Sequence, residues 1–168
     1  TDHGHYLGQH GLTAKGAFHY EDGLKVPFIV RHPGRVPAGR RSRRLQSLVD
    51  LAPTFLDAAG IESPGLMQGV SQLRSWTDDV AVRDHCLVEN RHQPTAIHIR
   101  TYINDRYKIT VYRQHDYGEL FDLEVDPDER SNKWDDPAYA QAKAELLLRF
   151  VQAEIRREPT RMPRVWHA

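Results

Sequence analysis

The chain has 168 residues, 39% of them hydrophobic, and a mean hydropathy of −0.65, which is typical of a water-exposed globular protein able to bury one sizeable core. Its 23 basic and 23 acidic residues give a formal net charge of zero. This balance argues against a protein that binds nucleic acid or an anionic membrane through an overall positive charge.

Cys86 is the single cysteine, so the chain cannot form an internal disulfide. The cysteine count leaves the compartment open, with a lean towards a reducing, cytoplasmic one. No apolar run approaches the roughly 18 residues of a membrane-spanning helix. No secretory leader is visible, but such a leader would stand upstream of the first residue.

The first part of the chain predicts a functional loop followed by a short strand. Residues 1–25 are rich in glycine and histidine and show no sustained period, as expected for a loop that carries function. Lys25 to Arg31 is an apolar run that predicts a buried strand, with Pro27 at its start or on a sheet edge. A basic loop is expected over 35–44.

Ser47 to Gly60 predicts a helix with clear end signals. Asp50 is a good N-cap, Pro53 falls in the first turn, and Gly60 can end the helix in the left-handed conformation. The expected apolar stripe is Leu51, Phe55, Leu56 and Ala59. Residues 61–84 are expected to be mostly irregular.

The second half predicts an antiparallel meander with a helix packed on it. The expected strands cover 86–89, 96–103, 107–112 and 120–123. Asp136 and Pro137 begin a long helix. Its expected buried face consists of Tyr139, Leu146, Leu147, Phe150, Val151 and Ile155.

Several motifs follow one another in a recognisable order. They are Thr1-Asp2-His3-Gly4, Leu7-Gly8-Gln9-His10-Gly11-Leu12, Lys15, Tyr20-Glu21-Asp22-Gly23 and Val26-Pro27-Phe28-Ile29-Val30. This series resembles an active-site segment of the sulfatases, which belong to the alkaline-phosphatase-like superfamily. Later stretches also resemble sulfatases, namely Ser47 to Leu56, Met67 to Ser71, and Gly118 to Leu123 with Asp126, Pro127, Glu129 and Asn132.

The resemblance implies the C-terminal part of an α/β fold of the alkaline-phosphatase type. Residues 1–80 would end the large catalytic domain. Residues 81–168 would form a small α+β subdomain with an antiparallel sheet and a C-terminal helix. The missing N-terminal part of the same enzyme would be the main partner of this chain.

Asp2 and His3 are the candidate metal ligands. Aspartate and histidine offer oxygen and nitrogen ligands, and a carboxylate favours hard divalent ions. The resemblance implies that both bind the active-site metal, with calcium as the first choice and magnesium or manganese as alternatives. It also implies that Lys15 donates to the sulfate ester or its leaving oxygen, where negative charge develops during cleavage.

Other polar residues have less defined roles. His10 is a candidate catalytic residue that could instead contact substrate or only the loop backbone. Arg91, His92 and His98 are candidates for the substrate-binding rim, together with Lys15. Glu21 is expected to pair with a basic residue and hold the loop. His5 and His19 are expected at the surface or lining the pocket, and the acidic residues of the late motif are expected to cap turns.

The sequence also departs from the family pattern. Sulfatases use a formylglycine made from a Cys or Ser in a "[CS]-x-[PA]-x-R" motif, and Cys86 lies outside such a motif. Cys86 is therefore expected to be a small buried hydrophobe. The formylglycine and further metal ligands are expected upstream, so the isolated chain should be inactive.

Two alternative functions stay open. A phosphonate or phosphate monoester hydrolase of the same superfamily would use a similar metal site for a doubly charged substrate. A non-catalytic remnant or oligomerisation module would lack the nucleophile. In that case the tail Met162 to Trp166 could serve contacts between copies in a homo-oligomer.

Overall fold

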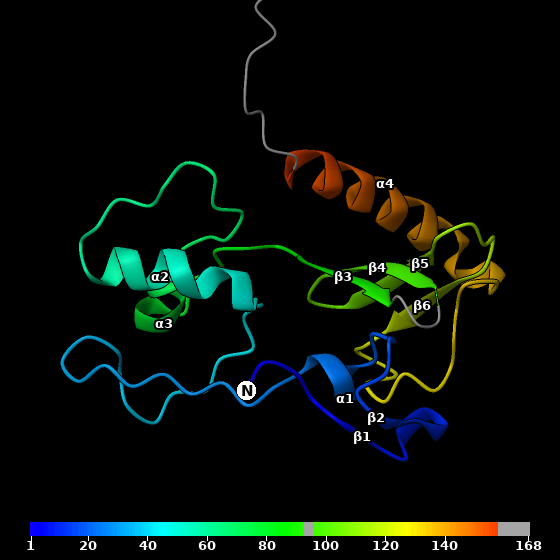
Figure 1. Ribbon diagram of the computed structural model, residues 1–168, viewed down its shortest axis with the longest axis horizontal. Coiled ribbons are helices and arrows are strands. Elements are labelled where there is room, and N and C mark those ends of the chain that lie inside the picture. The colour runs from blue at the N-terminus through cyan, green and yellow to red at the C-terminus, as the bar shows by residue number, and fades with distance from the viewer. Residues whose placement is uncertain (93–95, 158–168) are drawn as a thin grey trace, which may run out of the picture.

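The computed structural model describes residues 1–92 and 96–157 (Figure 1). The tail Met162 to Trp166 lies outside these residues. The elements are β1 (Tyr6–Leu7), η1 (Gln9–Gly11), β2 (Thr13–Ala14), α1 (Glu21–Leu24), η2 (Leu48–Asp50), α2 (Leu51–Ala58), α3 (Leu73–Asp78), β3 (Cys86–His92), β4 (Ile97–Ile103), β5 (Tyr107–Tyr112), β6 (Gly118–Asp122), η4 (Pro137–Tyr139) and α4 (Ala140–Arg157). Among the described helices, none has the length and apolar character that a bilayer crossing requires.

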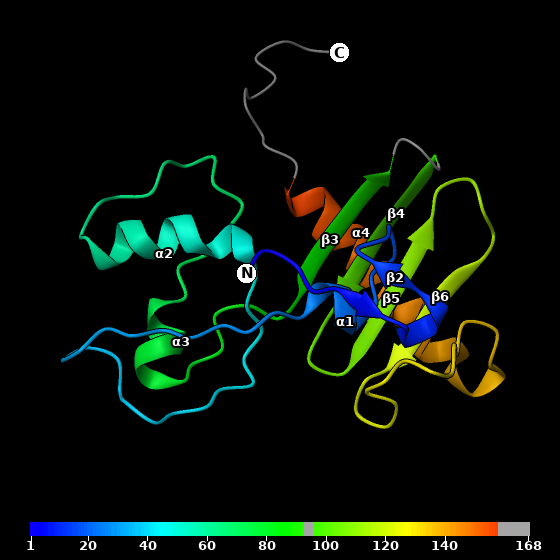
Figure 2. The same ribbon diagram turned by 60° about the horizontal axis from the view of Figure 1, so that its bottom comes forward.

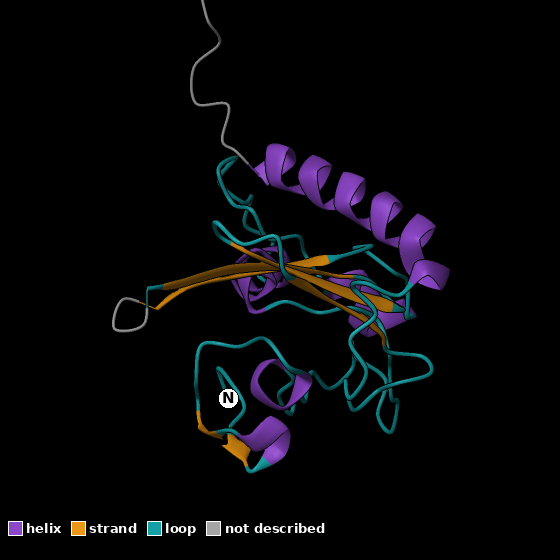
Figure 3. Cartoon of the chain, turned by 90° about the vertical axis from the view of Figure 1, so that its right-hand side faces the viewer, coloured by secondary structure: helices purple, strands orange, loops and turns teal. Residues whose placement is uncertain are grey.

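The predicted meander is confirmed. Strands β3, β4, β5 and β6 form an antiparallel sheet in sequence order. Helix α4 lies along one face of this sheet, which Figure 3 shows nearly edge-on. Asp136 begins the helical segment by accepting a hydrogen bond from the Ala138 amide, and Pro137 follows it.

The apolar core lies between the sheet and α4. It consists of Tyr102, Ile109, Leu120, Leu146, Phe150 and Ala153. Val151 and Ile155, which were expected in this face, are 55% and 62% exposed. The error lies in the angular width of the stripe, because about 100° separates successive helical residues and only the arc around Leu146, Phe150 and Ala153 reaches the sheet.

The opposite face of the sheet is covered by the N-terminal segment (Figure 2). Its buried side chains are largely polar, and they include Thr101, Lys108, Thr110 and Glu119. The Asn90 side-chain amide donates to the Ala17 carbonyl on this face (3.2 Å). The first 24 residues therefore fold back onto the sheet formed by β3 to β6.

The helix expected at 47–60 is present as η2 and α2, but it begins at the N-cap Ser47, and the Asp50 side chain makes no capping bond to α2. Asp50 is 1% exposed and follows the N-cap Ser47 in a capping box. Its carboxylate also accepts hydrogen bonds from the Val70 amide, the Gln72 side chain and the Arg83 guanidinium. Asp50 is thus a buried junction that joins η2 to the segments before and after α3.

Two other expectations about apolar residues in this half are wrong. Phe55 is 62% exposed, whereas Pro53 and Thr54 are the buried residues of α2. Lys25 to Arg31 forms no strand, and Ile29 is 91% exposed. A strand requires a neighbour for its backbone groups, and the described residues supply none to this run. Cys86 is buried as expected.

Candidate active-site segment

A small hairpin folds the N-terminal segment. Tyr6 pairs with Ala14 and Leu7 pairs with Thr13, so Lys15 returns to the level of His5. Tyr6 is fully buried and donates from its hydroxyl to the Phe18 carbonyl (2.9 Å). The hairpin therefore brings Lys15 back towards Asp2 and His3, although 12 or more positions separate them in sequence.

The side chains of the two candidate metal ligands, Asp2 and His3, lie close together. His3 Nδ1 lies 2.7 Å from the Gly4 carbonyl oxygen, and because a carbonyl only accepts, Nδ1 carries the proton. Nε2 of the neutral ring then presents its lone pair, 3.8 Å from Asp2 Oδ2. Two ligand atoms about 2.4 Å from a metal and at right angles would be about 3.4 Å apart, which is the distance to compare with the 3.8 Å between these two atoms.

Gly4 places this pair relative to α1. The Gly4 amide donates to the Gly23 carbonyl (2.8 Å), and a Cβ at position 4 would collide with the Asp22 carbonyl oxygen. Only glycine allows this approach, which accounts for the residue that follows Asp2 and His3.

The surroundings of Asp2 favour its ionised form. The pKa of Asp2 lies below its ordinary value because of its own backbone amide first, then the charge of His3 and, more weakly, that of Lys15. The Asp2 side chain is 84% exposed, and Lys15 is also exposed. Among the described residues, no group of three or more His, Cys, Asp or Glu side chains forms a metal site. Asp2 and His3 can thus supply two ligands of such a site but not all of them.

His10 is held against Tyr20. The two rings stack with centroids 3.8 Å apart and an interplanar angle of 7°. His10 Nε2 lies 4.0 Å from Asp22 Oδ2, and its side chain is 17% exposed. His10 also has a left-handed backbone, with φ 53°. Its ring orientation is therefore fixed by Tyr20 and the hairpin turn.

Arg91 and His98 lie on the other face of the sheet. They are cross-strand partners, and both approach Glu89, at 2.6 Å for Arg91 Nε and 3.6 Å for His98 Nε2. Glu89 also pairs with Arg157 of α4, and this hydrogen bond, ahead of those from the other arginines, holds its pKa at about 2. The structure therefore does not bring Arg91 and His98 together with the N-terminal segment. His92 ends β3, and its side chain is outside the described part.

The N-terminal segment is fixed to the sheet by residues that the sequence did not single out for this purpose. Lys108 is 1% exposed, and its ammonium lies 2.6 Å from Glu21 Oε1 and 2.7 Å from Glu129 Oε1. Tyr20 donates to Glu119 (2.7 Å). The expected pairing of Glu21 with a basic residue is confirmed, but Glu119 and Glu129 are not turn caps.

His19 is buried rather than exposed. Its Nδ1 lies 2.8 Å from Thr101 Oγ1. Burial, and secondarily the Lys108 charge, lower the pKa of His19 to about 4. No local pattern could have pointed to these partners, because they lie about 80 to 110 positions from the segment they hold, and only Glu119 and Glu129 belong to the late motif.

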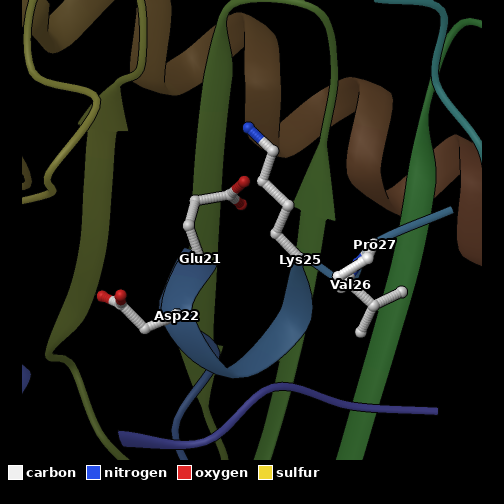
Figure 4. A pocket seen from close by; sticks show the side chains of 5 residues that line it. All are labelled: Glu21, Asp22, Lys25, Val26 and Pro27. Atoms are coloured by element: carbon white, nitrogen blue, oxygen red, sulfur yellow. The ribbon is translucent and has the colours of Figure 1, made fainter. Parts of the chain in front are cut away.

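A shallow open depression lies beside α1. It is lined by Glu21, Asp22, Lys25, Val26 and Pro27. Figure 4 shows the Glu21 and Asp22 carboxylates pointing to different sides of α1. Since Glu21 is engaged by Lys108, Asp22 and Lys25 are the charged groups left to shape this depression.

Solved structures share this arrangement of elements. A protein solved in complex with its substrate D-glucosamine-2-N,6-O-disulfate superposes with a TM-score of 0.87 at 28% identity, over 95% of this chain and 34% of that one. A phosphonate monoester hydrolase of Agrobacterium radiobacter, 21% identical, superposes with a TM-score of 0.80 over 92% of this chain and 34% of its own, which shows the fold alone. The fold is the C-terminal part of the alkaline-phosphatase-like architecture that sulfatases have.

The family follows from the sequence comparisons. The chain belongs to the family described as N-sulphoglucosamine sulphohydrolase, C-terminal, whose model matches residues 8–156. It is 32% identical to an N-acetylglucosamine-6-O-sulfatase of Bacteroides thetaiotaomicron over 155 residues, which cover 88% of this chain and 28% of the relative. The chain thus corresponds to a C-terminal portion of a sulfatase and spans about a third of the length of the proteins it matches.

Proposed function

We propose that this chain supplies the metal-binding pair Asp2 and His3 and the sulfate-contacting Lys15 to a sulfuric ester hydrolase. The observation that carries the proposal is the His3 ring, whose Nδ1 bonds the Gly4 carbonyl and whose Nε2 faces Asp2. A second-sphere bond of this kind fixes the tautomer and the orientation of a metal-binding imidazole.

The Asp2 carboxylate favours a hard divalent cation such as calcium. A bound cation would stabilise negative charge that develops on the ester during cleavage. Asp2 contributes an anionic oxygen, and His3 a neutral nitrogen held in one tautomer. The remaining ligands and the formylglycine nucleophile are to be supplied by parts of the enzyme other than this chain.

Lys15 binds and orients the substrate. Its exposed ammonium, returned by the hairpin to the level of His5, can donate to a sulfate oxygen or to the bridging oxygen. His10 has a fixed ring beside Asp22 and can donate a hydrogen bond at the rim. Arg91 and His98 do not enter this proposal, because their contacts lie on the α4 face.

The proposal is tested with variants of the full-length enzyme that contains this chain. Asp2→Asn should lower the affinity for Ca²⁺ at least about tenfold and lower turnover of an aryl sulfate with it. Asp116→Asn, a change at an exposed position, is the matched control and should alter neither. Metal content by mass spectrometry and turnover are measured together. Unchanged metal affinity in Asp2→Asn would remove Asp2 from the site.

The same preparation separates the sulfatase from its rival. Initial rates on an aryl sulfate and on an aryl phosphonate monoester are compared at equal metal saturation. We expect the sulfate ester to be the better substrate. A strong preference for the phosphonate would assign the chain to the other hydrolase class.

A further inference from the structure

Three consecutive residues of the N-terminal segment bond three different strands. His19 contacts Thr101 of β4, Tyr20 donates to Glu119 of β6, and Glu21 pairs with Lys108 of β5. The partner residues lie on the sheet face opposite α4. Such a clamp leaves residues 19–21 little freedom to slide or rotate on the sheet.

Lys108 is at the centre of this clamp. Its ammonium forms ion pairs with Glu21 Oε1 (2.6 Å) and Glu129 Oε1 (2.7 Å) and donates a hydrogen bond to the His19 carbonyl (3.0 Å). Two of these acceptors belong to the N-terminal segment. Because the ammonium is 1% exposed, water cannot replace an acceptor that moves away.

Glu129 makes a second connection between Lys108 and the N-terminal segment. Its second oxygen accepts from the Glu21 amide (2.6 Å), so the same carboxylate holds Lys108 and the start of α1. Glu129 also adopts a left-handed backbone, with φ 55°. A non-glycine residue keeps this conformation only where its surroundings fix it, and the bonds to Lys108 and Glu21 do so.

A short series of contacts leads from the clamp to the candidate metal ligands. Glu21 begins α1, and Gly23 in α1 accepts from the Gly4 amide (2.8 Å). The Gly4 carbonyl in turn accepts from His3 Nδ1 (2.7 Å). On the other side, the clamped Tyr20 carries the stacked His10. Movement of residues 19–21 would therefore move His3 and His10 together.

We propose that Lys108 is a positioning residue of the active site, which fixes residues 19–21 on the sheet and thereby sets the placement of His3, of its neighbour Asp2 and of His10. This inference rests on the function proposed above. Lys108 itself contacts neither metal nor substrate. Its role is to make the C-terminal sheet the base on which the metal-binding segment is held.

The test uses the full-length enzyme with Lys108→Met, which keeps a long side chain and removes the charge. Lys143→Met is the matched control, because the Lys143 ammonium also bonds a carbonyl, that of Trp134, but from α4 on the other side of the sheet. We expect Lys108→Met to weaken Ca²⁺ binding by about 10- to 100-fold and to lower turnover, with partial recovery at saturating Ca²⁺. Lys143→Met should leave the Ca²⁺ affinity unchanged.

Hydrogen exchange of the metal-free enzyme gives a readout independent of activity. Residues 2–24 should exchange faster in Lys108→Met, while β4 and β5 keep their protection. If Lys108→Met does not fold, Glu129→Gln replaces it, since Gln keeps the shape and weakens the hold on Lys108. A variant with a lowered melting temperature but unchanged Ca²⁺ affinity and unchanged exchange in residues 2–24 would overturn the proposal.

The Asp2→Asn variant separates the two proposals. If Asp2→Asn keeps full Ca²⁺ affinity, the metal site is wrong, and exchange in residues 2–24 still decides whether Lys108 places the segment. If Asp2→Asn loses the metal while Lys108→Met and Glu129→Gln keep it, the metal site stands and the positioning role of Lys108 fails.

Discussion

Asp50→Asn tests whether Asp50 is a helix cap or a buried junction. Asparagine keeps a side-chain oxygen that can accept from the Ser47 amide, so a role limited to the capping box predicts almost no loss of stability. In the structure, however, the two carboxylate oxygens of Asp50 accept from four donors, which are the amides of Ser47 and Val70 and the side chains of Gln72 and Arg83. An asparagine would turn an NH₂ group towards two of these donors.

The expected loss follows from these contacts. Removing one partner of a buried ion pair costs about 3–5 kcal/mol, and the lower end applies because the Arg83 side chain is 12% exposed. Asp50→Asn should therefore destabilise the protein by about 3 kcal/mol. Asp50→Ala, which leaves all four donors without their acceptor, should cost about 4–6 kcal/mol.

Urea unfolding of the full-length enzyme measures this loss, followed by Trp fluorescence. Trp76 is a suitable local probe, because it lies in α3 and donates to Gln46 beside this junction. Repeating Asp50→Asn in an Arg83→Met background should reduce its cost by about 2 kcal/mol if the two residues are coupled. A loss of stability below about 1 kcal/mol in Asp50→Asn would mean that Asp50 acts only within the capping box.

Two further predictions concern the N-terminal segment. In the full-length enzyme, Lys15→Ala should lower turnover about 10²- to 10³-fold with little change in melting temperature. Turnover of a substrate with a poor leaving group should fall more than turnover of one with a good leaving group. Unchanged turnover of both substrates would contradict the role of Lys15. The pKa of His19 is about 4 in the folded protein, against an ordinary value of 6.5. As the pH falls, the unfolded chain therefore takes up this proton before the folded protein does, so the free energy of unfolding should decrease between pH 6.5 and pH 4. The full decrease is about 3 kcal/mol. His19→Asn should flatten this part of the stability curve relative to the unchanged protein, and identical slopes would contradict the burial of His19.

The elements of the second half could be predicted because their signals are local. Alternation marks β4 and β5, and Asp136 with Pro137 marks the start of the helical segment. These patterns depend on neighbours a few positions away. The motif around Asp2 and His3 is recognised differently, by its resemblance to sulfatases, and the Gly4 carbonyl that His3 bonds is adjacent in sequence.

The burial of Lys108 could not be predicted in this way. In β5 it alternates with Tyr107 and Ile109, and such a pattern normally indicates a solvated face. The face is buried because residues 19–21 cover it from 87 or more positions upstream and bring a carboxylate to the ammonium. No local period contains that information.

Arg91 and His98 are a second case in which the local sequence does not reveal the surroundings of a side chain. Basic side chains near a strand end suggest an anion site, but in an antiparallel pair the register decides which face they occupy. Here Arg91 and His98 share a face with Glu89, which α4 meets through Arg157. Glu89, which both side chains approach, is also bonded by Arg157 and so joins the end of α4 to β3. The acidic partner, rather than the basic residues themselves, distinguishes a structural pair from a binding site.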